Sequence, residues 1–219
     1  MSAELEPPGP TEWTASEPVG VGPWVGDWPT ESRYDPELLR DGDRRNVVDA
    51  YRYWRREAIV ADIDNRRHPF HVAIENFGHD HNIGTVVRTA NAFAAAAVHV
   101  VGRSRWNRRG AMVTDRYQHL RHHATLEQLF DFARENGLAV VAVDNLPGSI
   151  RIEQATLPRE CVLLFGQEGP GVTEAGRIGA AMTVSIAQFG STRSINAGVA
   201  AGVAMHAWIR QHADLATAW

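Results

Sequence analysis

Short apolar runs that alternate with helical segments constrain the fold of this chain more than any other feature. Two runs, Cys161–Phe165 and residues 182–186, are short and each ends in a polar loop. Uninterrupted apolar runs of this length are typical of strands that are buried on both faces, as in a parallel sheet. Residues 70–74, 98–101 and 138–144 have the same character, so the sequence predicts a sheet built largely from such strands.

Segments with helical patterns lie between these runs, at residues 82–94 and 126–136. A strand, a helix and a second strand within some thirty residues form a right-handed unit whose two strands are parallel. We therefore predict an α/β fold, with a parallel sheet of five or six strands flanked by helices, over residues 68–219.

The residues before this domain differ from it in composition. Residues 1–42 are rich in Pro, Gly, Glu and Trp without periodicity, which predicts an acidic tail that is disordered by itself or docked through its tryptophans. Residues 43–67 have helical composition and are predicted to form a helical extension.

The basic residues of this chain are all arginine. The absence of lysine excludes a phosphate-binding loop of the GK[ST] type and any Schiff-base chemistry. A single cysteine, Cys161, excludes disulfides within the chain and cysteine-based zinc sites. The net charge of −4 conceals an acidic segment at residues 1–43, so the rest of the chain is mildly basic.

Two clusters of polar residues permit more than one interpretation. The arginines at 103, 105, 108 and 109 suit phosphate oxygens, but a solvated loop explains them equally well. His79, Asp80 and His81 are interpreted as a polar loop and not a metal site, because no second ligand motif accompanies them. No apolar segment approaches the length of a membrane span, so we expect a soluble, cytoplasmic protein with no membrane partner.

Polar loops follow the strands at 161–165 and 182–186 and should meet at one edge of the sheet. Open α/β sheets bind ligands at the carboxyl ends of their strands. The loops contain mainly glycine and uncharged polar residues, which favours a binding site over plain connections. Ser194 is interpreted as the N-cap of a long helix of small residues that runs to about His212.

Arg88 lies in an otherwise apolar helical segment and is therefore predicted to be partly buried. A buried arginine needs a partner. Its partner is either Glu168, in a structural ion pair, or the phosphate of a ligand; the spacing alone does not decide between them.

Three motifs occur in the order of a known family. They are Asn82-x5-Arg88, Phe165-Gly-x-Glu168-Gly-x-Gly171 and Ile186-x3-Gly190-x3-Ser194-Ile-Asn196. Together they resemble the motifs of the SpoU (TrmH-like) branch of the SPOUT RNA methyltransferases, over about residues 70–212. The resemblance implies a deep trefoil knot at the C-terminal end, S-adenosylmethionine as cofactor, and methyl transfer to a ribose 2′-hydroxyl of RNA.

Matching the motifs residue by residue gives a set of expected site residues. The expected catalytic residues are Asn82, Arg88, Glu168, Ser194 and Asn196. The expected cofactor-binding residues are Leu164, Phe165, Gly166, Glu168, Gly169, Ile186, Gln188, Ser194, Ile195 and Asn196. The expected RNA-binding residues are Arg103, Arg105, Arg108, Arg109 and Arg193. In the family the arginine is often assigned as the general base; because a guanidinium is a poor base, we expect Arg88 to orient a phosphate and stabilise developing charge.

Some positions depart from the common bacterial pattern of this family. Ala187 and Gln188 stand where many bacterial members have Pro-Met, and Gly198 replaces the second serine of the third motif. Gln188 together with Arg193 is more similar to members that methylate a guanosine of the tRNA D-loop. A tRNA substrate is therefore expected; an rRNA methyltransferase, a non-catalytic RNA-binding protein with the same fold, and a small-molecule α/β enzyme are the alternatives.

The predicted C-terminal helix has small residues over much of its surface. Gly198 and Gly202 are four residues apart, as are Ala197 and Ala201, so another backbone can approach closely. Packing within the domain accounts for part of this surface. The resemblance implies pairing through the knot, and we predict a homodimer built on this helix.

Overall fold

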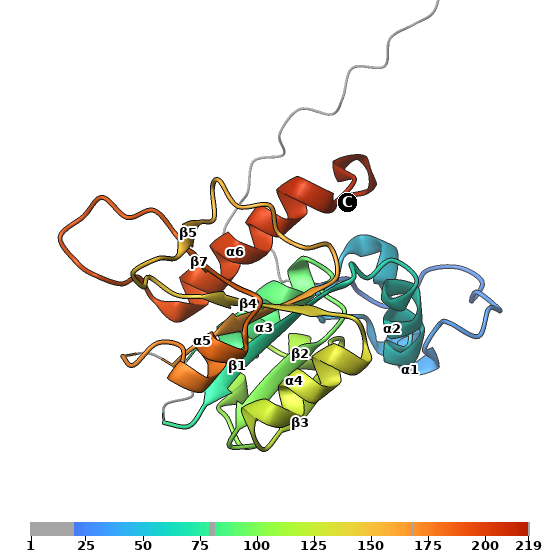
Figure 1. The fold of residues 1–219 in the computed structure, drawn as a ribbon. Helices are drawn as coiled ribbons and strands as arrows, with labels where there is room; N and C mark the ends of the chain where they lie inside the picture. The colour runs from blue at the N-terminus through green and yellow to red at the C-terminus, as the bar shows by residue number, and fades with distance from the viewer. Residues whose placement is uncertain (1–19, 79–81, 168, 219) are drawn as a thin grey trace, which may run out of the picture. The chain divides into compact units, whose positions relative to one another are not determined.

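The computed structural model describes residues 20–78, 82–167 and 169–218. The chain divides into two compact units, Met1–Ile59 and Val60–Trp219. The second unit contains a sheet of seven strands that are all paired in parallel. The strands are β1 Phe70–Asn76, β2 Val98–Gly102, β3 Leu120–His123, β4 Ala139–Val143, β5 Ile150–Arg151, β6 Cys161–Phe165 and β7 Met182–Ser185 (Figure 1). The prediction of an α/β fold with a parallel sheet is confirmed.

The strand order is β3-β2-β1-β6-β4-β7-β5, so the sixth strand in sequence lies in the middle of the sheet. Phe165, the last residue of β6, pairs with Ile74 of β1 on one side and with Val143 of β4 on the other. Val143 in turn pairs with Val184 of β7. The strands β1, β6, β4 and β7 therefore end at nearly the same level, and the loops that follow them start from one edge.

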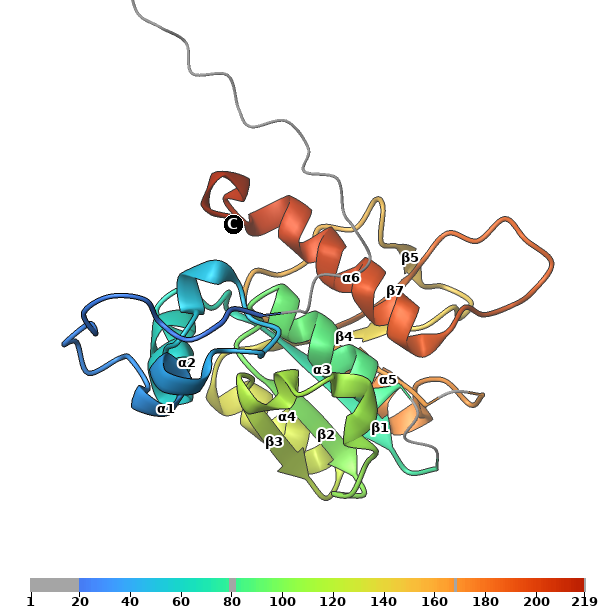
Figure 2. The same cartoon turned by 180° about the vertical axis from the view of Figure 1, so that it is seen from behind.

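Helices cover both faces of the sheet (Figures 1 and 2). On one face α3 (Ile83–Ala92) and α6 (Ala197–His212) bury Val86, Val87 and the fully buried Trp208 against the strands. On the other face α4 (Leu126–Glu135) buries Leu129, and α5 (Glu174–Gly179) follows the β6 loop. The core therefore has two apolar layers, one on each side of strands that are buried on both faces.

Two strands were not predicted from the sequence, which had indicated five or six. β3 reads Leu-Arg-His-His and lies at one edge of the sheet, so it contains no apolar run. β5 has only two residues, both exposed, and lies at the other edge. Edge strands have one unpaired side and need less apolar surface, which is why hydrophobic patterning did not identify them.

The long C-terminal helix begins later than predicted. Its N-cap is Asn196, whose Oδ1 accepts hydrogen bonds from the backbone N–H groups of Gly198 (3.0 Å) and Val199 (3.2 Å). Ser194 is exposed and precedes the helix, so its assignment as the N-cap was wrong. Asparagine and serine are both good N-caps, and only the position of the first helical turn decides between them.

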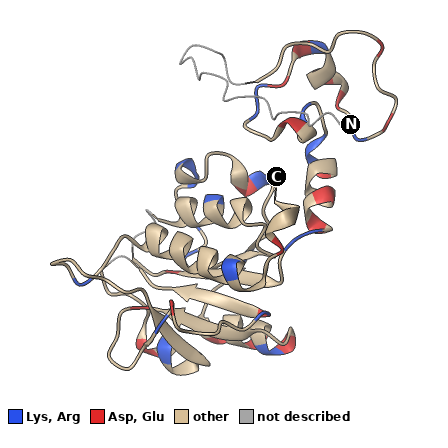
Figure 3. Ribbon diagram, turned by 90° about the horizontal axis from the view of Figure 1, so that it is seen from above, with Lys and Arg blue, Asp and Glu red and all other residues tan. Residues whose placement is uncertain are grey.

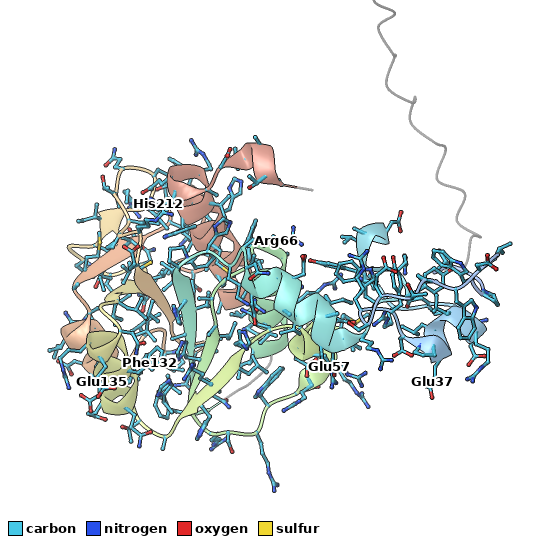
Figure 4. All side chains as sticks on the ribbon, turned by 90° about the vertical axis from the view of Figure 1, so that its right-hand side faces the viewer. Glu37, Glu57, Arg66, Phe132, Glu135 and His212 are labelled. Carbon is cyan, nitrogen blue, oxygen red and sulfur yellow. The ribbon has the colours of Figure 1, made fainter. Side chains whose placement is uncertain are left out.

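Three histidines form a hydrogen-bonded row across β1, β2 and β3. A ring nitrogen of His99 lies 2.9 Å from one of His71, and its other ring nitrogen lies 2.8 Å from one of His123. Phe132 of α4, which is labelled in Figure 4, packs against all three rings. Burial lowers the pKa of His71 to about 4 and that of His99 to about 2. The row is therefore neutral at physiological pH and belongs to the core under α4.

The first unit contains less helix than its composition suggested. Its described part includes α1 (Pro36–Asp41) and a 3₁₀ turn, Asp49–Tyr51, and α2 (Arg56–Asp64) begins near its end. The fully buried Asp43 accepts hydrogen bonds from Arg45 and from the backbone N–H of Tyr53, which has a positive φ of 63°. This carboxylate organises residues 43–55 as a loop, so a helix forms only in the second half of the predicted range, as α2.

Two short 3₁₀ helices, Arg108–Ala111 (η2) and Thr114–Arg116 (η3), lie between β2 and β3, and a further one, η4 (Leu215–Thr217), follows α6. Within the described ranges of the chain, no helix combines the length and the apolar character needed to cross a membrane.

Candidate active site

The loops that follow β4, β6 and β7, together with the start of α6, enclose a cavity of about 390 Å³. Its described lining residues are Val143, Asp144, Asn145, Leu146, Phe165, Gly166, Gln167, Gly169, Pro170, Gly171, Ile186, Gln188, Ser194, Ile195, Asn196, Ala197 and Ala200. Figure 1 shows the loop between β7 and α6 extending beyond this edge of the sheet, at the left of the view. The volume lies within the range of about 300–1,000 Å³ that is typical of small-molecule sites.

Glycine shapes the loop after β6. The backbone of Gln167 and that of Gly171 exchange two hydrogen bonds, of 3.1 and 3.0 Å. Gly169 and Gly171 have φ values of 98° and 73°, which side-chain-bearing residues rarely adopt. A Cβ atom on the buried Gly166 would collide with the backbone of Gly171. The described part of the loop is therefore a compact turn whose glycines allow close backbone packing beside the cavity.

Two carboxylates hold the end of this turn. Asp144, directly after β4, accepts a hydrogen bond from the backbone N–H of Val172 (2.8 Å). Glu75 of β1, which is 1% exposed, accepts hydrogen bonds from the backbone N–H (3.0 Å) and the hydroxyl (2.7 Å) of Thr173. Burial raises the pKa of the Glu75 carboxyl, and the negative charge of Asp144 acts in the same direction. Adjacent residues of one loop are thus tied to two different strands.

Two asparagines join the first motif to the third. Asn196 Nδ2 donates a hydrogen bond to Asn82 Oδ1, at 2.9 Å. Asn82 immediately precedes α3, and Asn196 caps α6 and lines the cavity. This hydrogen bond connects residues 114 positions apart in the sequence and places the start of α3 at the rim of the cavity.

Arg88 is exposed, which corrects the prediction that it is partly buried. Val86, Val87 and Ala90 face the core, whereas Thr85 and Arg88 lie on the solvent side of α3. Three residues separate these two positions, so they share one helix face. Apolar neighbours in sequence therefore do not bury Arg88. The proposed partner Glu168 lies outside the described residues.

The arginine-rich segment packs directly against the N-terminal half of α3. A Cβ atom on Gly84 would lie 2.6 Å from the backbone nitrogen of Ala111, so the backbones of α3 and η2 are in close contact. The buried Asn76 holds the preceding loop by donating hydrogen bonds to the carbonyl oxygens of Arg103 and Arg105. The four arginines Arg103, Arg105, Arg108 and Arg109 are all exposed. In Figure 3 the strands are mostly tan, and charged residues gather on loops and helix surfaces.

Most of the expected cofactor-binding residues lie in the wall of the cavity. They are Phe165, Gly166, Gly169, Ile186, Gln188, Ser194, Ile195 and Asn196. Leu164 is buried in the core layer under α4 and does not reach the cavity, because successive residues of a strand point to opposite faces. Arg193 is exposed, and its carbonyl oxygen accepts a hydrogen bond from Asn145.

Sequence reasoning missed the third loop of the site, at Asp144, Asn145 and Leu146. Asp144 was interpreted only as the end of the strand predicted at residues 138–144. The available signal was an acidic residue at the carboxyl end of an apolar run, in the same sheet as Gly166. The described residues contain no group of three His, Cys, Asp or Glu side chains arranged to hold a metal ion, and His79, Asp80 and His81 lie outside them.

The fold and this site define an α/β protein with a small-molecule cavity beside an arginine-rich surface. A protein-family model described as the SpoU rRNA Methylase family matches residues 69–206. The chain belongs to this family.

Similar proteins and solved structures agree with the assignment. The tRNA (guanosine(18)-2′-O)-methyltransferase of Thermus thermophilus is 27% identical over 165 residues, which cover 71% of this chain and 82% of that protein. An uncharacterized tRNA/rRNA methyltransferase of Mycolicibacterium smegmatis is 31% identical over 147 residues, covering 64% and 46%.

Two solved structures are similar in fold. The TrmH/SpoU tRNA modifying enzyme of A. aeolicus superimposes with a TM-score of 0.63 at 20% identity, covering 71% of this chain and 81% of that one. The SpoU methyltransferase AviRb of Streptomyces viridochromogenes, in complex with the cofactor AdoMet, superimposes with a TM-score of 0.60 at 25% identity. The match covers 68% of this chain and 60% of that one.

Proposed function

We propose that this protein transfers a methyl group from S-adenosylmethionine to a ribose 2′-hydroxyl of RNA. The observation that carries the proposal is the Asn82–Asn196 hydrogen bond, which brings the first motif to a cavity lined by the second and third motifs. The family assignment and the names of the relatives, which are RNA methyltransferases, support it.

The residues of the cavity suit this cofactor. Gly166 allows the backbone of Gly171 to pack closely against it, and the walls combine apolar residues such as Phe165 and Ile186 with amide side chains such as Gln188. Backbone groups of these loops would hold the adenosine part, and Ser194 and Asn196 would contribute polar contacts. When bound, the cofactor supplies a methyl group whose bond to a positively charged sulfur breaks as the bond to the 2′-oxygen forms, while the hydroxyl proton is released to solvent.

Arg88 and Asn82 would serve the RNA. Arg88 is exposed on α3, on the same helix whose N-terminus lies at the cavity rim. A guanidinium stays protonated, and its planar fork binds phosphate oxygens in a bidentate manner. We assign Arg88 to holding the phosphate next to the target ribose, and Asn82 to orienting that ribose; positioning of this kind is the main requirement for methyl transfer. Glu168 remains a proposed site residue on the motif alone.

We propose tRNA, in particular a guanosine of the D-loop, as the substrate and the cytoplasm as the location. The tRNA (guanosine(18)-2′-O)-methyltransferases among the relatives and the Gln188 and Arg193 pair support this choice. The test is mass-spectrometric mapping of ribose methylation in total RNA from a deletion strain, repeated with purified protein and tRNA transcripts.

Loss of one 2′-O-methylguanosine from tRNA supports the proposal, and loss from rRNA instead changes the substrate to the alternative. Cofactor binding without methylation of either RNA would indicate the non-catalytic RNA-binding function.

We also propose a homodimer that pairs through α6. Gly202 faces Thr89 of α3 within the same domain, so the small residues on this side are explained by internal packing. Other residues of α6 and the preceding loop expose apolar surface: Phe189 is 97% exposed, Val199 55% and Val203 39%. We expect wild-type protein to sediment as a dimer at micromolar concentration and a Val199→Arg, Val203→Arg variant to sediment as a folded monomer. A monomeric wild type would exclude this interface.

A further inference from the structure

The described wall of the cavity carries little charge. Among its described lining residues, Asp144 is the single charged side chain. The neighbouring basic residues Arg151 and Arg193 do not line the cavity. Arg151 instead donates a hydrogen bond to Ser185 Oγ. The described wall of the cavity is therefore negative, whereas the segment at residues 103–109 carries exposed arginines.

Asp144 is fixed in this position by the fold. Its Oδ2 accepts a hydrogen bond from the backbone N–H of Val172 (2.8 Å) and its Oδ1 one from that of Asn145 (2.7 Å). Each carboxylate oxygen has a second lone pair that these bonds leave available. Behind the same loop lies the buried carboxyl of Glu75, whose pKa is raised by burial and, to a lesser extent, by the charge of Asp144. The carboxyl groups of Asp144, which follows β4, and of Glu75 in β1 thus lie close enough to interact.

We propose that Asp144 is a specificity-determining residue that distinguishes the cofactor from its product by charge. S-adenosylmethionine carries a sulfonium, and after methyl transfer the sulfur is a neutral thioether. The two molecules are nearly equal in shape, so contacts with the adenosine part bind both alike. A carboxylate in the wall favours the cation, which promotes binding of the cofactor and release of S-adenosylhomocysteine. The inference rests on the proposed function.

The size of the cavity allows this effect wherever the sulfur lies. A sphere of the cavity's volume, about 390 Å³, is roughly 9 Å across, which is similar to the screening length of about 8–10 Å in physiological salt. The charge of Asp144 therefore acts on a cation anywhere inside it. For one carboxylate in a cavity that is open to water we expect a preference of about three- to tenfold.

Titration calorimetry with S-adenosylmethionine and S-adenosylhomocysteine tests the proposal. In the Asp144→Asn variant the ratio of the two dissociation constants should shift about three- to tenfold toward the product. Glu174→Gln is the matched control, because it removes one negative charge from the exposed start of α5 and leaves the cavity wall unchanged. Its ratio should equal that of the wild type.

Loosening of the loop would weaken the binding of both ligands equally and leave the ratio of their dissociation constants unchanged. An unchanged ratio in the Asp144→Asn variant therefore overturns the proposal. If that variant fails to fold, the wild type provides the test: raising salt from about 0.05 to about 0.5 M should reduce the preference for S-adenosylmethionine. A preference independent of salt would then overturn it. Wild-type protein that binds neither ligand would instead refute the proposed function itself.

Discussion

The cavity and the arginine-rich segment of this protein carry side chains of opposite charge. The described wall of the cavity has one charged side chain, Asp144, while residues 103–109 expose four arginines. Both are shaped by close backbone packing at a glycine, Gly166 against Gly171 and Gly84 against η2. On the proposed function, the cationic cofactor would bind in the cavity, and the anionic RNA would contact the arginines.

The start of α3 joins these two regions. Asn82 is hydrogen-bonded to Asn196 of the cavity wall, and the following residues pack against η2. The start of α3 therefore contacts both the cavity wall and the arginine-rich segment. Substitutions in one of these two regions should therefore affect the binding of one ligand and leave the binding of the other unchanged.

The largest effect is expected for Arg88→Ala, which should lower methyl transfer by about a hundredfold or more while S-adenosylmethionine affinity changes less than about threefold. Arg88→Lys should fail similarly, because an ammonium cannot replace a bidentate fork. Steady-state kinetics and calorimetry measure the two quantities. Arg134→Ala, an exposed arginine on α4, is the control and should be fully active. Normal turnover of Arg88→Ala would remove this residue from the mechanism.

Gly166→Ala should disrupt the cavity and weaken the binding of the cofactor. Its Cβ atom would collide with the backbone of Gly171, so the turn must shift and S-adenosylmethionine affinity should fall about tenfold or more. RNA affinity should be retained. Gly190→Ala, where the added Cβ meets no atom within 4 Å, is the matched control for calorimetry. Equal cofactor affinity in both variants would show that the β6 turn does not form the site.

Neutralising Arg103, Arg105, Arg108 and Arg109 to glutamine should affect RNA and leave the cofactor bound. Each arginine that contacts a phosphate contributes about one unit to the slope of log affinity against log salt. Filter binding over a range of salt concentrations should therefore give a flatter slope for the quadruple variant. If the slope equals that of the wild type, this segment is a solvated loop, and RNA is bound elsewhere.

The smallest effect, a change in stability, is expected for substitution of Glu75, whose carboxyl accepts hydrogen bonds from Thr173 at the end of the β6 turn. Burial raises the pKa of its carboxyl above the ordinary value of 4.5, so the folded state holds this proton more tightly than the unfolded state. Its contribution to stability is present below pH 4.5 and is lost as pH rises through the raised pKa. Glu75→Gln should therefore gain stability relative to wild type between about pH 5 and pH 8.

Urea unfolding at both pH values measures this change. Thr173→Val, which removes the hydroxyl that donates to Glu75, should have the opposite sign at high pH. A pH-independent difference between Glu75→Gln and wild type would mean that the carboxyl is not perturbed by burial.

Several parts of the site could be predicted from sequence because local patterns determine them. Uninterrupted apolar runs identified the central strands, and the glycines of the β6 turn occupy positions with positive φ or close backbone contact. The order of three motifs indicated the family before any coordinates. The trefoil knot, the catalytic roles and the dimer stay predictions.

The exposure of Arg88 and the position of Asp144 in the cavity wall could not be predicted in this way. Whether Arg88 is buried depends on which side of α3 faces the sheet, and a mixed apolar segment leaves that rotation open. Asp144 enters the site because β4 lies between β6 and β7, an order that local sequence does not encode.

The sequence by itself determined the buried strands, the turn glycines and the surplus of arginine in the domain. Tertiary structure alone decided that the ends of β4, β6 and β7 meet around one cavity and that Asn82 lies beside Asn196. The physical reason is the sequence distance over which each effect acts. Backbone conformation and apolar patterning depend on a few neighbouring residues, whereas strand order is set by packing between segments that are far apart in the chain.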